Sequence, residues 1–225
     1  MSLIATLLIG AGIAFTIRAW SKAKQHQREA FLDHYRFPER LHSKLLQRYP
    51  HLTTEQGNKV LRGLREYFQL CRLAGNKRVA MPSQAVDVAW HEFILYTQQY
   101  AQFCRKGLGR FLHHTPNDAL RNASASAEAM TRTWRLACAR VGLAPHTTRV
   151  LPWLFTLDTE LSIADGFSYR PDCGAAPGSI GADNAFCVSH FSCSSGGDTS
   201  STSSTGCSSD SGSSGCSSGC GGGGD

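Results

Sequence analysis

Apolar side chains recur at steps of three and four residues over much of the chain, which is the period of an amphipathic helix. The longest such stripe follows Ser83, a residue type that often caps helices. Its members are Val86, Trp90, Phe93, Thr97, Tyr100 and Cys104. Gly107 ends the stripe, since glycine takes the backbone angles that close a helix. The spacing predicts one continuous helix between Ser83 and Gly107, with its tryptophan side buried.

The same period and several capping signals predict three neighbouring helices. They run from Pro38 to Pro50, from Thr53 to Gly75 and from Thr115 to Gly142. In the second helix, Thr53 and Gln56 have the spacing of a capping box. The inner side of the third would be formed by Leu120, Met130, Trp134, Cys138 and Val141. Together these helices predict a mainly α fold, with a small helical bundle in residues 38–170.

Beyond Pro145 the pattern is less regular. Residues 151–163 fit either a short helix or a strand that covers the bundle. Asp158 and Glu160 fall in this stretch, and we interpret both as solvated, although Asp158 could face a cleft.

The amino-terminal segment has a different character, because residues 1–17 carry no charge and are rich in large apolar side chains. As a helix they would reach roughly 25 Å, at the short end of what spans a bilayer. Trp20 and the basic residues after it suit a membrane interface. We expect a transmembrane anchor in residues 1–20; a buried core helix or an uncleaved export signal would be the alternatives.

The distribution of charged residues also favours a membrane anchor at the amino-terminal end. The formal net charge is +6, and the stretch from Arg18 to Arg48 accounts for +5 of it, with eight basic residues against three acidic ones. This excess directly follows the apolar segment, so it predicts a basic juxtamembrane helix in residues 21–37 that faces anionic lipid. By the positive-inside rule the C-terminal domain is then cytoplasmic, on the inner membrane of the cell. Nucleic acid is not an expected partner, because the basic residues are not interleaved with aromatic ones on a folded surface.

The carboxyl-terminal segment is of low complexity. Residues 192–225 hold 14 Ser, 10 Gly and 4 Cys, too few apolar side chains to offset the entropy of folding. We expect a flexible Gly/Ser/Cys-rich tail over residues 171–225. Its cysteines have no zinc-knuckle spacing and would stay reduced in the cytoplasm. They are Cys173, Cys187, Cys193, Cys207, Cys216 and Cys220.

The side chains most capable of chemistry lie on and just after the long predicted helix. Asp87 and His91 are four residues apart, so they share one face. They form either a carboxylate–imidazole pair that orients a half-buried histidine, or a metal ligand or general base held by its carboxylate. His113 or His114 could return after the glycine turn to complete a zinc or iron site. Adjacent histidines point in different directions, so only one of the two would help.

Two other possibilities are weaker. On a continuous helix Cys104 would be about 20 Å of rise away from His91, so the two could not hold one ion. His91 and Glu92 open like the zinc-protease signature, but Leu95 stands where its second histidine belongs.

Several motifs resemble one family. They are Asp87-x-x-Trp90-His91, Tyr100-x-x-Phe103-Cys104, Phe111-Leu112-His113-His114 and the later Leu151-Pro152-Trp153-Leu154-Phe155. With the Gly/Cys-rich end, they are similar to the glycine-rich domain-containing protein-like family, in a bacterial, membrane-anchored form. The resemblance covers about residues 38–173, and members in plants are similar around Trp-His-x-His, where this chain has Phe93 in place of the second histidine. It implies no established activity.

Three hypotheses follow. The first, not an enzyme, is a membrane-held helical scaffold that binds a protein partner. The second is a metal-binding protein or metal-dependent enzyme that uses Asp87 and His91 with His113 or His114. The third is a thiol redox protein that uses Cys104 or the tail cysteines. Trp90 and Tyr100 complete the candidate cluster around these groups.

Overall fold

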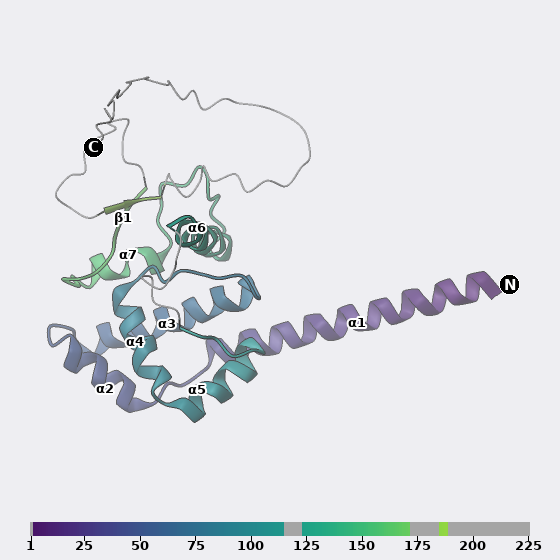
Figure 1. Ribbon diagram of the computed structural model, residues 1–225, viewed down its shortest axis with the longest axis horizontal. Coiled ribbons are helices and arrows are strands. Elements are labelled where there is room, and N and C mark those ends of the chain that lie inside the picture. The colour runs from purple at the N-terminus through teal and green to yellow at the C-terminus, as the bar shows by residue number, and fades with distance from the viewer. Residues whose placement is uncertain (1, 115–122, 172–184, 189–225) are drawn as a thin grey trace, which may run out of the picture. The chain divides into compact units, whose positions relative to one another are not determined.

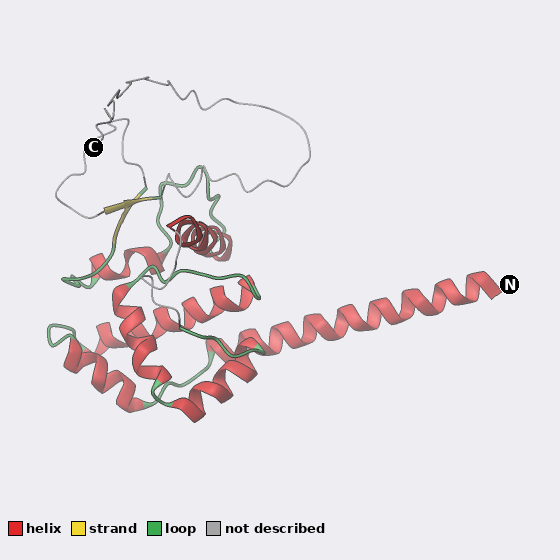
Figure 2. Cartoon of the chain, viewed as in Figure 1, coloured by secondary structure: helices red, strands yellow, loops and turns green. Residues whose placement is uncertain are grey.

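The computed structural model describes residues 2–114, 123–171 and 185–188 of the 225. The predicted mainly helical fold is confirmed in this part of the chain (Figure 2). In order, its elements are α1 (Ser2–Asp33), α2 (Glu39–Arg48), α3 (Thr54–Ala74), α4 (Gln84–Ile94), α5 (Thr97–Phe103), the π-helical turn η1 (Cys104–Leu108), α6 (Ala123–Arg140), α7 (Trp153–Glu160), β1 (Ser168–Arg170) and β2 (Ala185–Cys187).

Helix α3 is the centre of the packing, since it contacts α1, α2, α4, α6 and α7 (Figure 1). Val60, Leu64 and Phe68 on α3 are fully buried. At Gly63 an added Cβ would lie 2.9 Å from side-chain atoms of both Leu157 and Val86. Glycine therefore lets α4 and α7 approach α3 closely.

The local capping signals are confirmed. The Thr53 amide donates to the Gln56 side chain at 2.8 Å, and the Gln56 amide donates to the Thr53 hydroxyl at 3.2 Å, which completes the capping box. Helix α3 ends at Gly75, whose φ is 60°. Helix α2 begins directly after Pro38, as predicted.

The prediction of one continuous helix from Ser83 to Gly107 was wrong. Helix α4 ends at Ile94, and Tyr96, with φ −82° and ψ 59°, starts α5 in a new direction. Across this corner the rings of Phe93 and Phe103 lie 5.2 Å apart, whereas ten residues of straight helix would separate them by about 15 Å. The corner thus brings both halves of the stripe onto the same core. Trp90 is only 4% exposed, as predicted.

Two residues that were predicted to be buried are exposed, for related reasons. Thr97 is exposed because it lies at the start of α5, just after the corner. Val141 is 55% exposed because α6 ends at Arg140, one residue earlier. The start of the predicted third helix, including Leu120, lies outside the described residues.

Asp158 is the main correction in the later part of the chain. Residues 153–160 form the short helix α7 rather than a covering strand. The Asp158 side chain, interpreted from the sequence as solvated, is buried with 2% exposure. Glu160 is exposed, as interpreted from the sequence, and pairs with Lys59 at 2.5 Å.

At the amino-terminal end, α1 is continuous through to Asp33. Among the residues whose side chains are described, no helix is both long and apolar enough to cross a membrane. The side chains of residues 1–8, which belong to the predicted anchor, lie outside the described residues. Large apolar side chains of α1 that are described and exposed are Ile9, Ile13, Phe15, Ile17 and Trp20.

Most of the predicted flexible tail also lies outside the described residues. Within its range, however, Ala185–Cys187 pairs in parallel with Ser168–Arg170, and Val188 is buried. These four residues therefore belong to the fold, which the sequence did not indicate. Cys187 is disulfide-bonded, whereas the predicted cytoplasmic location would keep it reduced.

Candidate metal centre

Helix α4 places Asp87 and His91 one turn apart on the same face. The Nδ1 atom of His91 lies 3.2 Å from the Asp87 carboxylate and 2.9 Å from the Asp87 carbonyl oxygen. The carboxylate is partly buried, and the His91 side chain is 50% exposed. This pair matches the prediction made from the four-residue spacing.

His114 joins the pair from a distant part of the chain. After η1 the backbone turns at Gly109, whose φ is 73°, and residues 110–114 run back toward α4 as irregular chain. The Nε2 atom of His114 lies 3.1 Å from the second oxygen of Asp87. Its ring lies 4.0 Å from that of His91 and 4.5 Å from that of Trp90. Of the two adjacent histidines, the structure thus places His114 in the cluster.

Buried aromatic residues hold the segment that carries His114. The Trp90 indole N–H donates to the Tyr100 hydroxyl at 3.1 Å, and that hydroxyl donates to the Leu112 carbonyl at 2.6 Å. Both rings are almost fully buried, so this chain of hydrogen bonds is shielded from water. Tyr100 therefore fixes the backbone two residues before His114.

The geometry of the three groups suits one metal ion. One ligand atom from each of Asp87, His91 and His114 can be chosen so that all three lie within 4.8 Å of one another. Two ligands bound tetrahedrally at about 2.0–2.1 Å would be about 3.3 Å apart. The two nitrogen–oxygen distances, 3.1 and 3.2 Å, are close to that value. They are equally those of hydrogen bonds, so geometry alone permits both a metal centre and a metal-free triad.

The remaining candidate residues lie outside this cluster. His113 is exposed, and its ring packs on Phe111 at 4.8 Å. Cys104 is fully buried, and burial raises the pKa of its thiol. A buried protonated thiol is a poor nucleophile.

A cleft of about 540 Å³ adjoins the cluster. Asp87, His91 and His114 form part of its wall. The remaining wall comes from the loop between α3 and α4, the segment after η1, and residues of α3, α4, α6 and the chain before β1. The volume is in the range of sites for small molecules.

The residue that anchors α4 is Asp158, which was not among the candidate site residues predicted from the sequence. The first amides of a helix have no partner within it, and here the Asp158 carboxylate accepts from the amides of Gln84 and Ala85 at 2.6 and 3.2 Å. It also accepts from the Ser83 hydroxyl at 2.6 Å and from the Phe167 amide at 2.9 Å. No local signal reveals this contact, because Asp158 lies more than 70 positions away from α4 in the chain.

The fold and the cluster define a class: a helical protein in which a carboxylate and two histidines converge beside a cleft. The chain belongs to the UCP032817-like family, whose model matches residues 27–191. That range contains α2 to α7, both strands and all three residues of the cluster. No curated protein and no solved structure matches the chain. The resemblance to the glycine-rich domain-containing protein-like family stays a prediction.

Proposed function

We propose that this protein binds a divalent transition-metal ion through Asp87, His91 and His114. The observation that carries the proposal is the convergence of these three side chains, from two separate segments, onto one point. The hydrogen bonds from Trp90 to Tyr100 and from Tyr100 to Leu112 support it, because they join the two segments. Asp158 supports it as well, because it fixes the start of α4. Preorganised supports of this kind are typical of ligand sets in metal proteins.

The ligand set favours zinc or iron. Two imidazoles and one carboxylate are the protein ligands of several catalytic zinc sites and of non-haem iron(II) oxygenases. In both classes three protein ligands leave coordination positions open to water or substrate. The adjoining cleft gives such positions access from solvent. An ion there would act as a Lewis acid toward a molecule bound in the cleft.

Metal analysis of the purified full-length protein, after incubation with Zn²⁺ or Fe²⁺ and removal of excess ion, tests the proposal. We expect one equivalent in the wild type, and loss of stoichiometric metal in Asp87→Asn, His91→Ala and His114→Ala. His113→Ala is the matched control, because this neighbouring histidine is exposed and outside the cluster. Equal metal content in His113→Ala and His114→Ala, or none in the wild type, would contradict the proposal.

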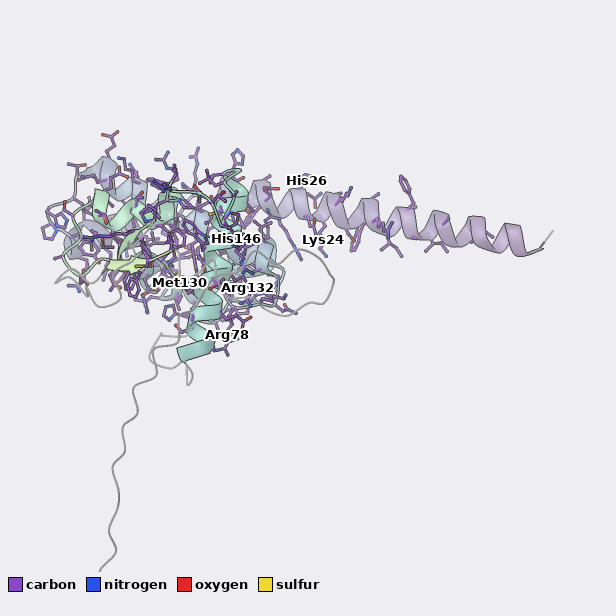
Figure 3. The ribbon with its side chains drawn as sticks, turned by 90° about the horizontal axis from the view of Figure 1, so that it is seen from above. Lys24, His26, Arg78, Met130, Arg132 and His146 are labelled. Carbon is purple, nitrogen blue, oxygen red and sulfur yellow. The ribbon has the colours of Figure 1, made fainter. Side chains whose placement is uncertain are left out.

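A membrane-held binding or scaffold protein is the second candidate. The exposed apolar side chains along α1 favour it, since a contiguous run of large apolar groups is unfavourable in water. Lys24 and His26 follow on the same helix, as Figure 3 shows, where a headgroup region would lie. We propose that residues 1–20 enter the inner membrane and that the folded domain lies on its cytoplasmic side.

A further inference from the structure

Basic side chains outnumber acidic ones on the wall of the cleft. Among the described residues that line it, three are basic, namely Lys77, Arg78 and Arg110, and the only acidic one is Asp87. Asp87 already faces two histidines. The cleft therefore has an excess of positive charge, which an ion at the cluster would increase.

These basic side chains have hydrogen-bond donors that no described contact uses. Arg110 gives one N–H to the Gly75 carbonyl at 2.6 Å, and a guanidinium has five. Lys77 and Arg78 are exposed and form no side-chain ion pair or hydrogen bond among the described residues. Arg132, on α6, donates to the Arg78 carbonyl at 2.6 Å, and Figure 3 labels both residues. That bond fixes the backbone of Arg78 and leaves its guanidinium available.

Apolar side chains form another part of the wall. Trp90 and Leu112 contribute from the buried side, and Met81 and Phe167 from two other segments. Guanidinium groups match the geometry of carboxylates and phosphates. A wall that holds both apolar and basic side chains thus suits an amphipathic anion of small size.

We propose that the cleft binds a small organic acid, whose anionic group lies between the ion and the basic residues while its apolar part contacts Trp90 and Phe167. The inference deepens the proposed function and rests on it for the ion's share of the binding. It names the class of molecule on which the ion would act.

Calorimetric titration of the zinc-loaded full-length protein with benzoate, benzamide and inorganic phosphate tests this proposal. Benzoate and benzamide have nearly the same shape, but only benzoate is charged. We expect benzoate to bind at least about tenfold more tightly than benzamide, because hydrogen bonds to charged groups are the stronger ones. Phosphate binding tighter than benzoate binding would overturn the assignment to an organic acid.

The matched variants are Lys77→Gln/Arg78→Gln and Arg105→Gln. The first pair removes charge from the cleft, and no described side-chain contact depends on these two residues. Arg105 is exposed on η1 and does not line the cleft, so it serves as the control. We expect benzoate affinity to fall about tenfold in the double variant and to stay unchanged in the control; equal affinities in all three proteins would overturn the inference.

The two proposals fail in different ways. If the protein takes up metal but binds no benzoate, the metal function stands and the organic-acid site is wrong. If no metal binds, benzoate binding that still falls in Lys77→Gln/Arg78→Gln supports the anion site by itself. If neither binds, both proposals are wrong.

Discussion

The Asp158 carboxylate accepts a 2.6 Å hydrogen bond from the Ser83 hydroxyl, although 75 residues separate the two in the chain. Ser83 in turn caps α4 by accepting from the Val86 amide at 3.3 Å. One buried acid on α7 therefore sets the position of the helix that carries Asp87 and His91. The stability of the fold and the geometry of the candidate metal centre depend on the same contact.

Asp158→Asn should destabilise the protein by about 2–4 kcal/mol, because buried hydrogen bonds to a charged group are lost and amide donors are left without a partner. Urea unfolding, followed by circular dichroism, measures this change. Asp165→Asn is the control, since Asp165 is an exposed acid in the loop after α7. Similar unfolding midpoints for the two variants would show that Asp158 does not cap α4 in solution.

Tyr100→Phe should weaken metal binding by more than the loss of folding stability alone would explain. The variant removes the hydroxyl that joins Trp90 to the Leu112 carbonyl, at a cost of about 1–2 kcal/mol in stability. With the backbone before His114 released, zinc affinity should fall about tenfold, as for other groups that orient ligands. Competition with a chelator measures the affinity. Tyr96→Phe, whose hydroxyl forms no described hydrogen bond, should leave it unchanged.

The buried cysteines should be unreactive in the folded protein. Burial raises the pKa of the Cys71 thiol from its usual 9.0 to about 12, and that of the Cys138 thiol to about 11. Both are then protonated at pH 8, where alkylation requires the thiolate. Iodoacetamide should modify them only after unfolding, which mass spectrometry of Cys71, Cys104 and Cys138 peptides can measure. Rapid alkylation of native Cys104 would revive the redox hypothesis.

The same shifts predict loss of stability at alkaline pH. Folded-state pKa values that are raised above the unfolded ones mean that the folded state binds more protons at high pH. The stabilising contribution is complete below about pH 8.5–9, the unfolded value, and is lost as the pH rises toward about 12 at Cys71. The pKa of buried Tyr169 is also raised by burial. Urea midpoints should therefore fall between pH 9 and pH 11.

Removal of residues 1–17 should move the protein from the membrane fraction to the supernatant after alkaline carbonate extraction. The reason is the loss of the apolar segment that we propose to enter the bilayer. Trp20→Ala alone should leave the protein in the membrane fraction, since an interfacial residue contributes little of the anchoring. Full-length protein that stays in the supernatant would contradict the anchor. Labelling of thiols from outside intact cells after reduction tests whether the folded domain is cytoplasmic. The disulfide at Cys187 argues against that orientation.

Features set by neighbouring residues could be predicted from the sequence, and features set by distant ones could not. The Thr53–Gln56 capping box and the end of α3 at Gly75 depend on a few adjacent positions, and both are confirmed. The corner at Tyr96 has no glycine or proline to mark it; it forms because Phe93 and Phe103 gain a shared core. The cap by Asp158 likewise depends on tertiary packing alone.

Part of the candidate site could be predicted from the sequence for the same reason. The spacing of Asp87 and His91 is local, and it predicts a pair. The sequence could not choose between His113 and His114, because that choice depends on how the chain returns after Gly109. The structure makes it by tying Leu112 to Tyr100.

The contact of Leu32 with Gly107 has a mechanical consequence. A Cβ on Gly107 would lie 2.4 Å from the Leu32 side chain, so α1 and η1 meet with no room between them. Only two residues separate Gly107 from Arg110, and His114 follows shortly after. A displacement of α1 at this contact would therefore also shift η1 and the segment after it, which carries both groups.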